Sequence, residues 1–184
     1  IECIKDNEIF TFNSKFLIGC DGASSFVRKS LDIELDDFGY NQKWLVCDAH
    51  MIKDLNLKNE LIQVCNPKRP CTFLHGRRGH LRFEFRVMPD DNLKDLENED
   101  FVWNLLSPWI DKNNAKLERS VIYNFHACIA NKWQKGNIFI AGDSAHQMPP
   151  FMGAGMGTGI RDVANLSWKI NLVLKNIAKS EILK

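Results

Sequence analysis

Hydrophobic and polar positions in the first forty residues predict a hairpin followed by a strand, a turn and a short helix. Two short alternating runs, residues 1–3 and 8–12, flank a Lys-Asp-Asn segment that is typical of a hairpin turn. Residues 15–20 form a continuous apolar run, which we expect to be a strand buried on both faces of a mostly parallel sheet. Asp21-Gly22 then predicts a turn, ahead of a helix that a serine caps and that ends near Leu31.

The middle of the chain has a strand-rich pattern. In residues 80–88 four apolar side chains alternate with polar or charged ones, so this strand should have one apolar and one charged face. A polar loop then leads to a helix whose apolar positions run from Phe101 to Trp109. The expected strands are residues 44–52, 61–65, 71–75, 80–88 and 119–125.

The last part of the chain returns to a strand followed by a helix. Residues 137–141 predict a second continuous buried strand, and a loop rich in glycine and proline follows it. Apolar residues then recur at three- and four-residue steps from Met156 to Ile177, which predicts a long amphipathic helix. The order predicts an α/β fold, with one domain formed by residues 1–40 and 118–184 and a β-rich domain of residues 41–117 inserted in it.

Composition narrows the class of protein. The 184 residues are 45% hydrophobic and carry a net charge of +1, as in an ordinary globular protein with no charge-driven attraction to nucleic acid or anionic lipid. No apolar run approaches the roughly 20 residues of a membrane span. The six cysteines show no spacing typical of a metal site, so we expect reduced thiols, no metal and a cytoplasmic location.

Residues 142–165 carry the most chemical information. A buried strand delivers Asp143 to the carboxyl edge of the sheet, where open α/β sheets bind ligands. Pro149-Pro150 stiffens the loop, and four glycines at alternate positions from Gly153 to Gly159 leave the backbone accessible. The long helix starts there, so its free N–H groups and positive dipole end face the bound group.

Three common motifs do not explain this stretch. It has no Gly-Lys-Ser/Thr of a P-loop, and its glycines do not follow the dinucleotide GxGxxG pattern. His146 stands where the last glycine of a hydrolase nucleophile elbow belongs. A glycine-rich turn that simply leads into a core helix remains the alternative. Residues 17–28 favour a binding site, because they place a second aspartate, Asp21, at the end of another predicted strand.

These two stretches resemble the Asp-Gly and Gly-Asp motifs of the flavin-dependent aromatic hydroxylases, a family of FAD monooxygenases. The segments FGYNQKWLVCD, CNPKRP and VWNLLSPW extend the resemblance over nearly the whole chain. The resemblance implies a partial FAD-binding, Rossmann-like domain with an inserted β-rich substrate-binding domain. Because the family's N-terminal GxGxxG unit is absent from this sequence, we expect the chain to be an internal fragment.

The resemblance also implies roles for individual residues. Asp143 would bond the ribityl chain of FAD, Pro150 would lie against the isoalloxazine, and Met156 with its flanking glycines would present N–H groups to the N1–C2=O edge. Asp21 and Gly22 would serve the pyrophosphate side and the nicotinamide approach, whereas His146 and Arg161 would be structural. The expected cofactor-binding residues are Asp21, Gly22, Asp143, Pro150, Gly153, Gly155, Met156 and Gly157.

The implied reaction uses NADH or NADPH to reduce FAD and O2 to hydroxylate a phenolic acid similar to 3-(3-hydroxyphenyl)propanoate. The β-rich domain would cover the flavin, with its apolar face lining the aromatic pocket. The alternatives are a remnant of the fold that cannot hold FAD, and a related flavin reductase or epoxidase. No general base is predicted. The residues that could bind a substrate carboxylate are Arg77, Arg78, Arg82 and Arg86. The alternative is that these arginines form a solvated face.

Overall fold

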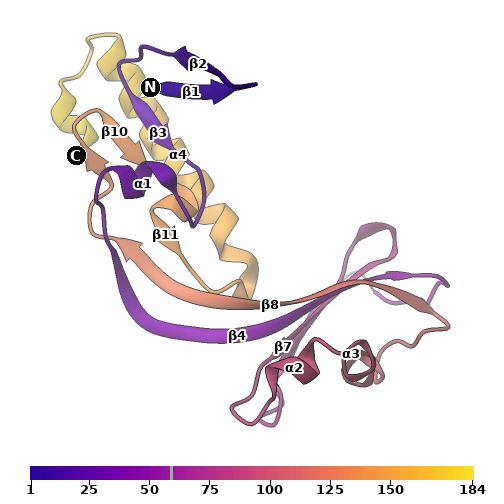
Figure 1. Ribbon diagram of the computed structural model, residues 1–184. Coiled ribbons are helices and arrows are strands. Elements are labelled where there is room, and N and C mark those ends of the chain that lie inside the picture. Colours follow the sequence, from indigo (N-terminus) through magenta and orange to yellow (C-terminus); the bar gives the residue numbers. More distant parts are fainter. Residues whose placement is uncertain (59) are drawn as a thin grey trace. The chain divides into compact units, whose positions relative to one another are not determined.

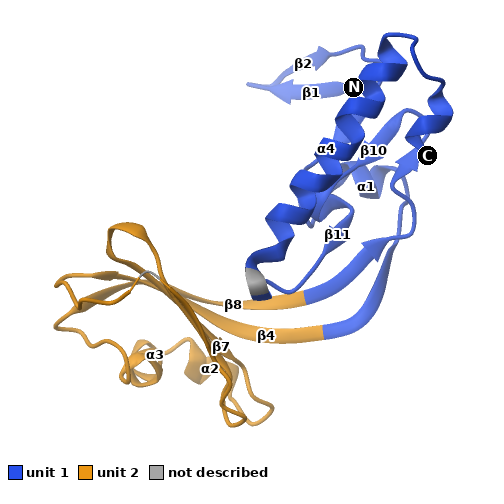
Figure 2. Ribbon diagram, turned by 180° about the vertical axis from the view of Figure 1, so that it is seen from behind, with its two compact units in different colours: residues 1–40, 126–184 blue, residues 41–125 orange. Residues whose placement is uncertain are grey.

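The computed structural model describes residues 1–58 and 60–184 (Figure 1), and these residues divide into two compact units (Figure 2). Unit 1 comprises residues 1–40 and 126–184, and unit 2 comprises residues 41–125. Two long strands, β4 (Leu35–Met51) and β8 (Ala115–Ala130), continue from one unit into the other and are neighbours in one sheet. Each of the expected strands of the middle segment is present, and β8 is longer than the predicted residues 119–125.

Unit 1 contains the predicted hairpin, the strand–turn–helix segment and the long helix. The hairpin turns at Asp6 and Asn7, whose positive φ angles of 52° and 64° suit a type I′ turn. A separate three-stranded sheet has the strand order β3 (Leu17–Gly19), β10 (Ile138–Ile140) and β9 (Gln134–Lys135). The elements are β1 (Glu2–Lys5), β2 (Glu8–Thr11), β3 (Leu17–Gly19), α1 (Phe26–Ser30), β9 (Gln134–Lys135), β10 (Ile138–Ile140), β11 (His146–Gln147) and α4 (Ala154–Leu174).

The parallel pair β3 and β10 determines where the two strand-end aspartates lie. Gly19 is aligned with Ile140, and the Ala141 amide donates to the Gly19 carbonyl at 3.0 Å. Because parallel strands end at the same edge, both aspartates follow at that edge. The prediction that β3 is buried on both faces is wrong: it is an edge strand of its sheet, and Ile18 is 41% exposed.

Helix α4 confirms the predicted helix but not the burial of its whole apolar stripe. Its C-terminal half packs on the sheet, where Ile170 contacts Phe139, while Met156 is 80% and Ile160 60% exposed. The helix ends before Ile177 because Asn176 adopts a left-handed φ of 56°, and the Ile177 amide donates to the Leu172 carbonyl, as in a Schellman motif. No helix among the described residues is long and apolar enough to cross a membrane.

Unit 2 is an antiparallel sheet with helices on one face. Strand β7 (His80–Arg86) pairs with β4 on one side and with β6 (Cys71–His75) on the other. Its residues Leu81, Phe83 and Phe85 are buried, while the side chains between them are partly exposed. This confirms the predicted alternation. The further elements are β5 (Leu61–Val64), β6 (Cys71–His75), β7 (His80–Arg86), α2 (Leu93–Leu96) and α3 (Glu99–Leu106).

The apolar face of β7 does not line an aromatic pocket, contrary to our expectation. It packs against the helices in a core that includes Phe83, Val102 and Leu106, each 0% exposed. The Phe83 ring stacks on Phe73 with centroids 4.6 Å apart and also contacts Trp109. The apolar face of this strand is therefore the hydrophobic core of unit 2.

We predict that Phe83→Ala lowers the free energy of unfolding by about 3–5 kcal/mol, because it removes a fully buried ring from this stack. The control is Phe38→Ala, since Phe38 is 71% exposed and its loss should change stability by less than about 0.5 kcal/mol. Urea unfolding followed by tryptophan fluorescence measures both variants. Equal unfolding midpoints for the two would contradict the described core.

Candidate functional site

The turns that follow β3 and β10 are held together by a small hydrogen-bond network. Ser144 Oγ donates to Asp21 Oδ1 and accepts from the Gly22 amide, both at 3.0 Å. Ser25 Oγ donates to the same Asp21 oxygen at 2.5 Å. The buried Arg28 donates from Nη1 to the Ser144 carbonyl at 3.1 Å. The bonds of Ser144 join it to residues of the other segment that are 116 to 123 positions away in the sequence.

The Asp21 carboxylate is ionised and accepts hydrogen bonds from donors of the protein itself. Partial burial raises its pKa, but hydrogen bonds from Ser25, the Val27 amide and Ser144 outweigh this effect and bring the pKa to about 2. The Val27 amide donates to Asp21 Oδ2 at 3.0 Å. Asp21 therefore joins the start of α1 to the turn after β10, which positions its neighbour Gly22.

The first turn of α4 offers backbone amides. Gly153 at its N-cap has a left-handed φ of 62° and provides no side-chain cap. The first amides of a helix have no acceptor within the helix, and the positive end of the macrodipole lies there. Among the described residues outside the backbone of α4 itself, a Cβ atom at Gly157 would meet no atom within 4 Å, and one at Gly155 would meet only Met148 Cγ at 4.0 Å. These amides are therefore sterically accessible to a bound group.

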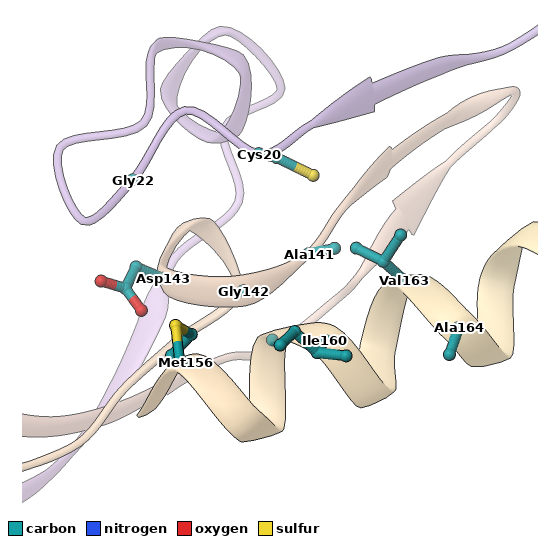
Figure 3. Close-up of a pocket in the computed structure, with 10 residues that line it drawn as sticks. Cys20, Gly22, Ala141, Gly142, Asp143, Met156, Ile160, Val163 and Ala164 are labelled. Carbon is teal, nitrogen blue, oxygen red and sulfur yellow. The ribbon is translucent and has the colours of Figure 1, made fainter. Parts of the chain in front are cut away.

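A cavity of about 640 Å³ lies between the two turns and α4 (Figure 3). That volume is within the range of about 300–1,000 Å³ that is typical of small-molecule and cofactor sites. Met156, Ile160 and Val163 form an apolar wall on α4, and Gly22 and Asp143 lie at the strand ends. The arrangement combines an apolar surface, a carboxylate and a helix N-terminus.

The Asp143 carboxylate is exposed at the edge of this cavity. Its side chain forms no hydrogen bond or ion pair with the described residues, in contrast to Asp21. A carboxylate that is an acceptor only suits a ligand with hydroxyl groups. The site therefore fits a molecule that combines an apolar part, hydroxyl groups and negative charge.

The structure brings three of the eight predicted cofactor residues together at the cavity: Gly22, Asp143 and Met156 line it. The two glycines that flank Met156 lie in the same helical turn but do not line the cavity. Pro150 and Gly153 precede the helix and do not line the cavity, and Asp21 lies beside it with its carboxylate engaged as described.

Two residues of this region were not predicted to contribute to the site. Ser144 bridges the two turns, and Asp162 Oδ2 accepts from the Gly142 amide at 3.0 Å. Asp162 is three positions after Gly159 and so lies on the same face of the helix. That spacing is the feature of the sequence that could have indicated Asp162. No feature of the sequence indicates the partner of Ser144, because it depends on the strand pairing.

A second polar cluster lies on the charged face of the sheet in unit 2. The buried Asp48 accepts from Arg82 Nε at 2.7 Å and Nη2 at 3.1 Å, and from Arg119 Nε at 2.7 Å. Partial burial raises the pKa of Asp48, but the two guanidinium groups lower it overall. Arg82 therefore pairs with a carboxylate of the protein itself, Asp48, whereas we had considered it as a partner for a substrate carboxylate.

We predict that Asp21→Asn destabilises the protein near neutral pH and that the difference from wild type shrinks as the pH falls. The pKa of Asp21 is depressed from 3.8 to about 2, so its contribution is complete above about pH 5 and is lost between about pH 4 and pH 2. Since the side chain is largely exposed, we expect a contribution of about 1 kcal/mol or less. Urea unfolding at pH 7, 4 and 2.5 measures it.

The matched control is Asp36→Asn, which removes an exposed carboxylate of the same unit. The control should remain within about 0.5 kcal/mol of wild type at each pH. A difference between Asp21→Asn and wild type that is constant from pH 7 to pH 2.5 would contradict the described network.

Comparison with known proteins identifies the family. A family model described as an FAD binding domain matches residues 3–184. A probable NADH-specific resorcinol 4-hydroxylase from Rhodococcus jostii (strain RHA1) is 38% identical over 170 residues, which are 92% of this chain and 32% of the relative. A 3-(3-hydroxy-phenyl)propionate/3-hydroxycinnamic acid hydroxylase from Escherichia coli (strain SE11) is 32% identical over 174 residues, 94% of this chain and 31% of the relative. The chain thus spans about a third of the length of these curated relatives.

Solved structures share the fold. Aklavinone-11 hydroxylase in complex with FAD and aklavinone matches with a TM-score of 0.83 at 21% identity, over 97% of this chain and 35% of that one. A p-nitrophenol 4-monooxygenase from Pseudomonas putida DLL-E4 also gives 0.83, at 19% identity, over 99% of this chain and 47% of that one. The predicted α/β fold class is confirmed. The chain belongs to the FAD binding domain family of the flavin-dependent aromatic hydroxylases, as the motifs around Asp21 and Asp143 predicted.

Proposed function

We propose that this chain provides flavin-binding and substrate-binding parts of an FAD-dependent monooxygenase that hydroxylates a phenolic compound with NADH or NADPH and O2. The observation that carries the proposal is the cavity in unit 1, where the exposed Asp143 carboxylate and the first turn of α4 lie beside one apolar wall. We assign flavin binding to residues 1–40 and 118–184 and substrate binding to residues 41–117. The two compact units, with boundaries at residues 40/41 and 125/126, support this assignment.

The residues of the cavity fit FAD. In the proposed complex Asp143 would accept hydrogen bonds from ribityl hydroxyls, and the amides of Gly155 and Met156, which have no acceptor within the helix, would donate to the N1–C2=O edge beside Gly157. The N-terminus of α4 would stabilise negative charge at that edge by up to about 2 kcal/mol in a partly buried setting. Pro150 would lie against the ring, while Gly153 and Gly155 keep side chains away from it. When bound, FAD supplies electron transfer from the nicotinamide and activation of O2.

The strand-end turns would hold the other half of the cofactor. Gly22 has a positive φ of 82°, and apart from its chain neighbours no described residue lies within 4 Å of an added Cβ, so its backbone would be accessible to a pyrophosphate or a nicotinamide. Asp21 would act there by holding Gly22 in place, because its own lone pairs are engaged by Ser25, Ser144 and the Val27 amide.

A phenol is the substrate class that the relatives support. Their names specify resorcinol and 3-(3-hydroxy-phenyl)propionate, which share a phenolic ring although only the second is an acid. The first name also specifies NADH, which supports NADH as the reductant. Arg82 is paired with Asp48. The remaining candidates for recognition of an acidic substrate are therefore Arg77, Arg78 and Arg86.

Expression of the complete reading frame that encodes this chain tests the proposal. We expect a yellow protein with bound FAD, in which resorcinol or 3-(3-hydroxyphenyl)propanoate increases NADH oxidation and gains one oxygen atom, as measured by mass spectrometry. FAD binding without an oxygenated product would favour a reductase. Absence of FAD binding would favour a non-catalytic remnant of the fold, and either result would overturn the hydroxylase.

We also predict that Gly155→Leu separates fold stability from flavin binding. The position has open space and lies in a helix, so leucine should leave the free energy of unfolding unchanged or raise it by up to about 1 kcal/mol. The added side chain should nevertheless reduce FAD affinity about tenfold or more, because it occupies the space over the amides. Thermal unfolding and FAD titration measure the two quantities.

The control is Ser167→Leu, an exposed position of α4 outside the cavity. It should bind FAD like the wild type. If Gly155→Leu and Ser167→Leu had the same FAD affinity, the first turn of α4 would not be the flavin site.

A further inference from the structure

We propose that Asp162, oriented by His146, is a positioning residue that fixes the Gly142-Asp143 turn against helix α4. The inference rests on the proposed flavin site, because it concerns how the two walls of that site are held at a fixed spacing. Neither side chain lines the cavity, so both act through the backbone of Gly142.

One oxygen atom makes both bonds. Asp162 Oδ2 accepts from the Gly142 amide at 3.0 Å and contacts His146 Nε2 at 2.6 Å. The two side chains are largely buried, with 14% of Asp162 and 8% of His146 exposed. Hydrogen bonds to a charged acceptor in such a partly dry environment are stronger than those between neutral groups. Asp162 therefore ties α4 to the residue immediately before Asp143.

The backbones of the turn and the helix touch at this point. Gly142 has a left-handed φ of 62°, and a Cβ atom at Gly159 would lie 3.3 Å from Gly142 Cα. Glycine is therefore used where the helix and the turn approach most closely. With this contact and the Asp162 bond in place, Asp143 on the turn and Met156 on the helix are held at one separation.

His146 determines the orientation of the Asp162 carboxylate. Its ring stacks on Trp133 with centroids 5.4 Å apart and planes at 28°. Its Nδ1 atom is buried and has no hydrogen-bond partner among the described residues, so the ring is held by the stack and by Nε2. Because a carboxylate oxygen accepts, the bond to Asp162 requires the His146 tautomer that carries its proton on Nε2, and this ring nitrogen is the donor.

The test compares variants in the protein expressed from the complete reading frame. Asp162→Ala removes both bonds, and His146→Leu removes the donor while keeping an apolar side chain. His146→Gln keeps an N–H donor and should rescue binding. We expect FAD dissociation constants about tenfold or more above wild type for Asp162→Ala and His146→Leu, and within about threefold for His146→Gln. Asp36→Asn is the control for loss of an exposed acid.

A second readout does not need the cofactor. Amide exchange of Gly142, measured by NMR in the protein without FAD, should accelerate about tenfold or more in Asp162→Ala, because that amide loses its acceptor. If Asp162→Ala does not fold, Asp162→Asn and His146→Leu are measured in the same way, and His146→Leu then decides the outcome.

The outcomes separate the two proposals. Wild-type FAD affinity in both Asp162→Ala and His146→Leu would overturn the positioning role and leave the flavin site standing. Equal affinity losses in His146→Leu and His146→Gln would overturn the donor role of His146. If wild-type protein binds no FAD, the proposed function fails. The exchange rate of the Gly142 amide then tests the contact between Asp162 and Gly142 by itself. Faster exchange in Asp162→Ala supports this contact, and an unchanged rate overturns it.

Discussion

The parallel pairing of β3 with β10 is the constraint on which the candidate site depends. It brings the Asp-Gly turn and the Gly-Asp turn to one edge of the sheet although Gly22 and Ser144 are 122 positions apart. Hydrogen bonds through Ser144 and Arg28 then lock the turns to each other. A one-residue slip of β10 would reverse the direction of every side chain in the strand and separate these partners. The geometry of the site is thus a consequence of strand register.

The two aspartates at this edge have different roles despite similar positions. Asp21 is surrounded by donors of the protein and holds the fold, with its pKa lowered to about 2. Asp143 has an exposed carboxylate without a partner among the described side chains, and it faces the cavity. The contrast separates a residue that builds the site from one that is available to a ligand. Two glycines of α4, Gly155 and Gly157, support the same interpretation, because glycine weakens a helix by roughly 1 kcal/mol relative to alanine and these two leave open space over the backbone, whereas Gly159 allows the close approach of Gly142.

Much of the fold follows from local patterns, and the departures have one physical cause. Alternation identified the two faces of β7, and the three- and four-residue steps identified α4, because both reflect the geometry of single elements. Periodicity does not say what covers an apolar face. For that reason it missed that β7 packs on α3 and that Met156 and Ile160 remain exposed. The bonds of Ser144 could not be predicted from the sequence, since they depend on the strand pairing, and for Asp162 the spacing from Gly159 indicated only the face of the helix, not the bonding partner.

The central claim is that the first turn of α4 binds the flavin ring. Hydrogen–deuterium exchange of the protein with and without FAD tests it most directly, because amides at the start of a helix lack helical acceptors and exchange fast when no ligand is bound. The account predicts that FAD slows exchange at residues 155 and 156 about tenfold or more and leaves α3 in unit 2 unchanged. Unchanged exchange at residues 155 and 156 while FAD is bound would contradict it.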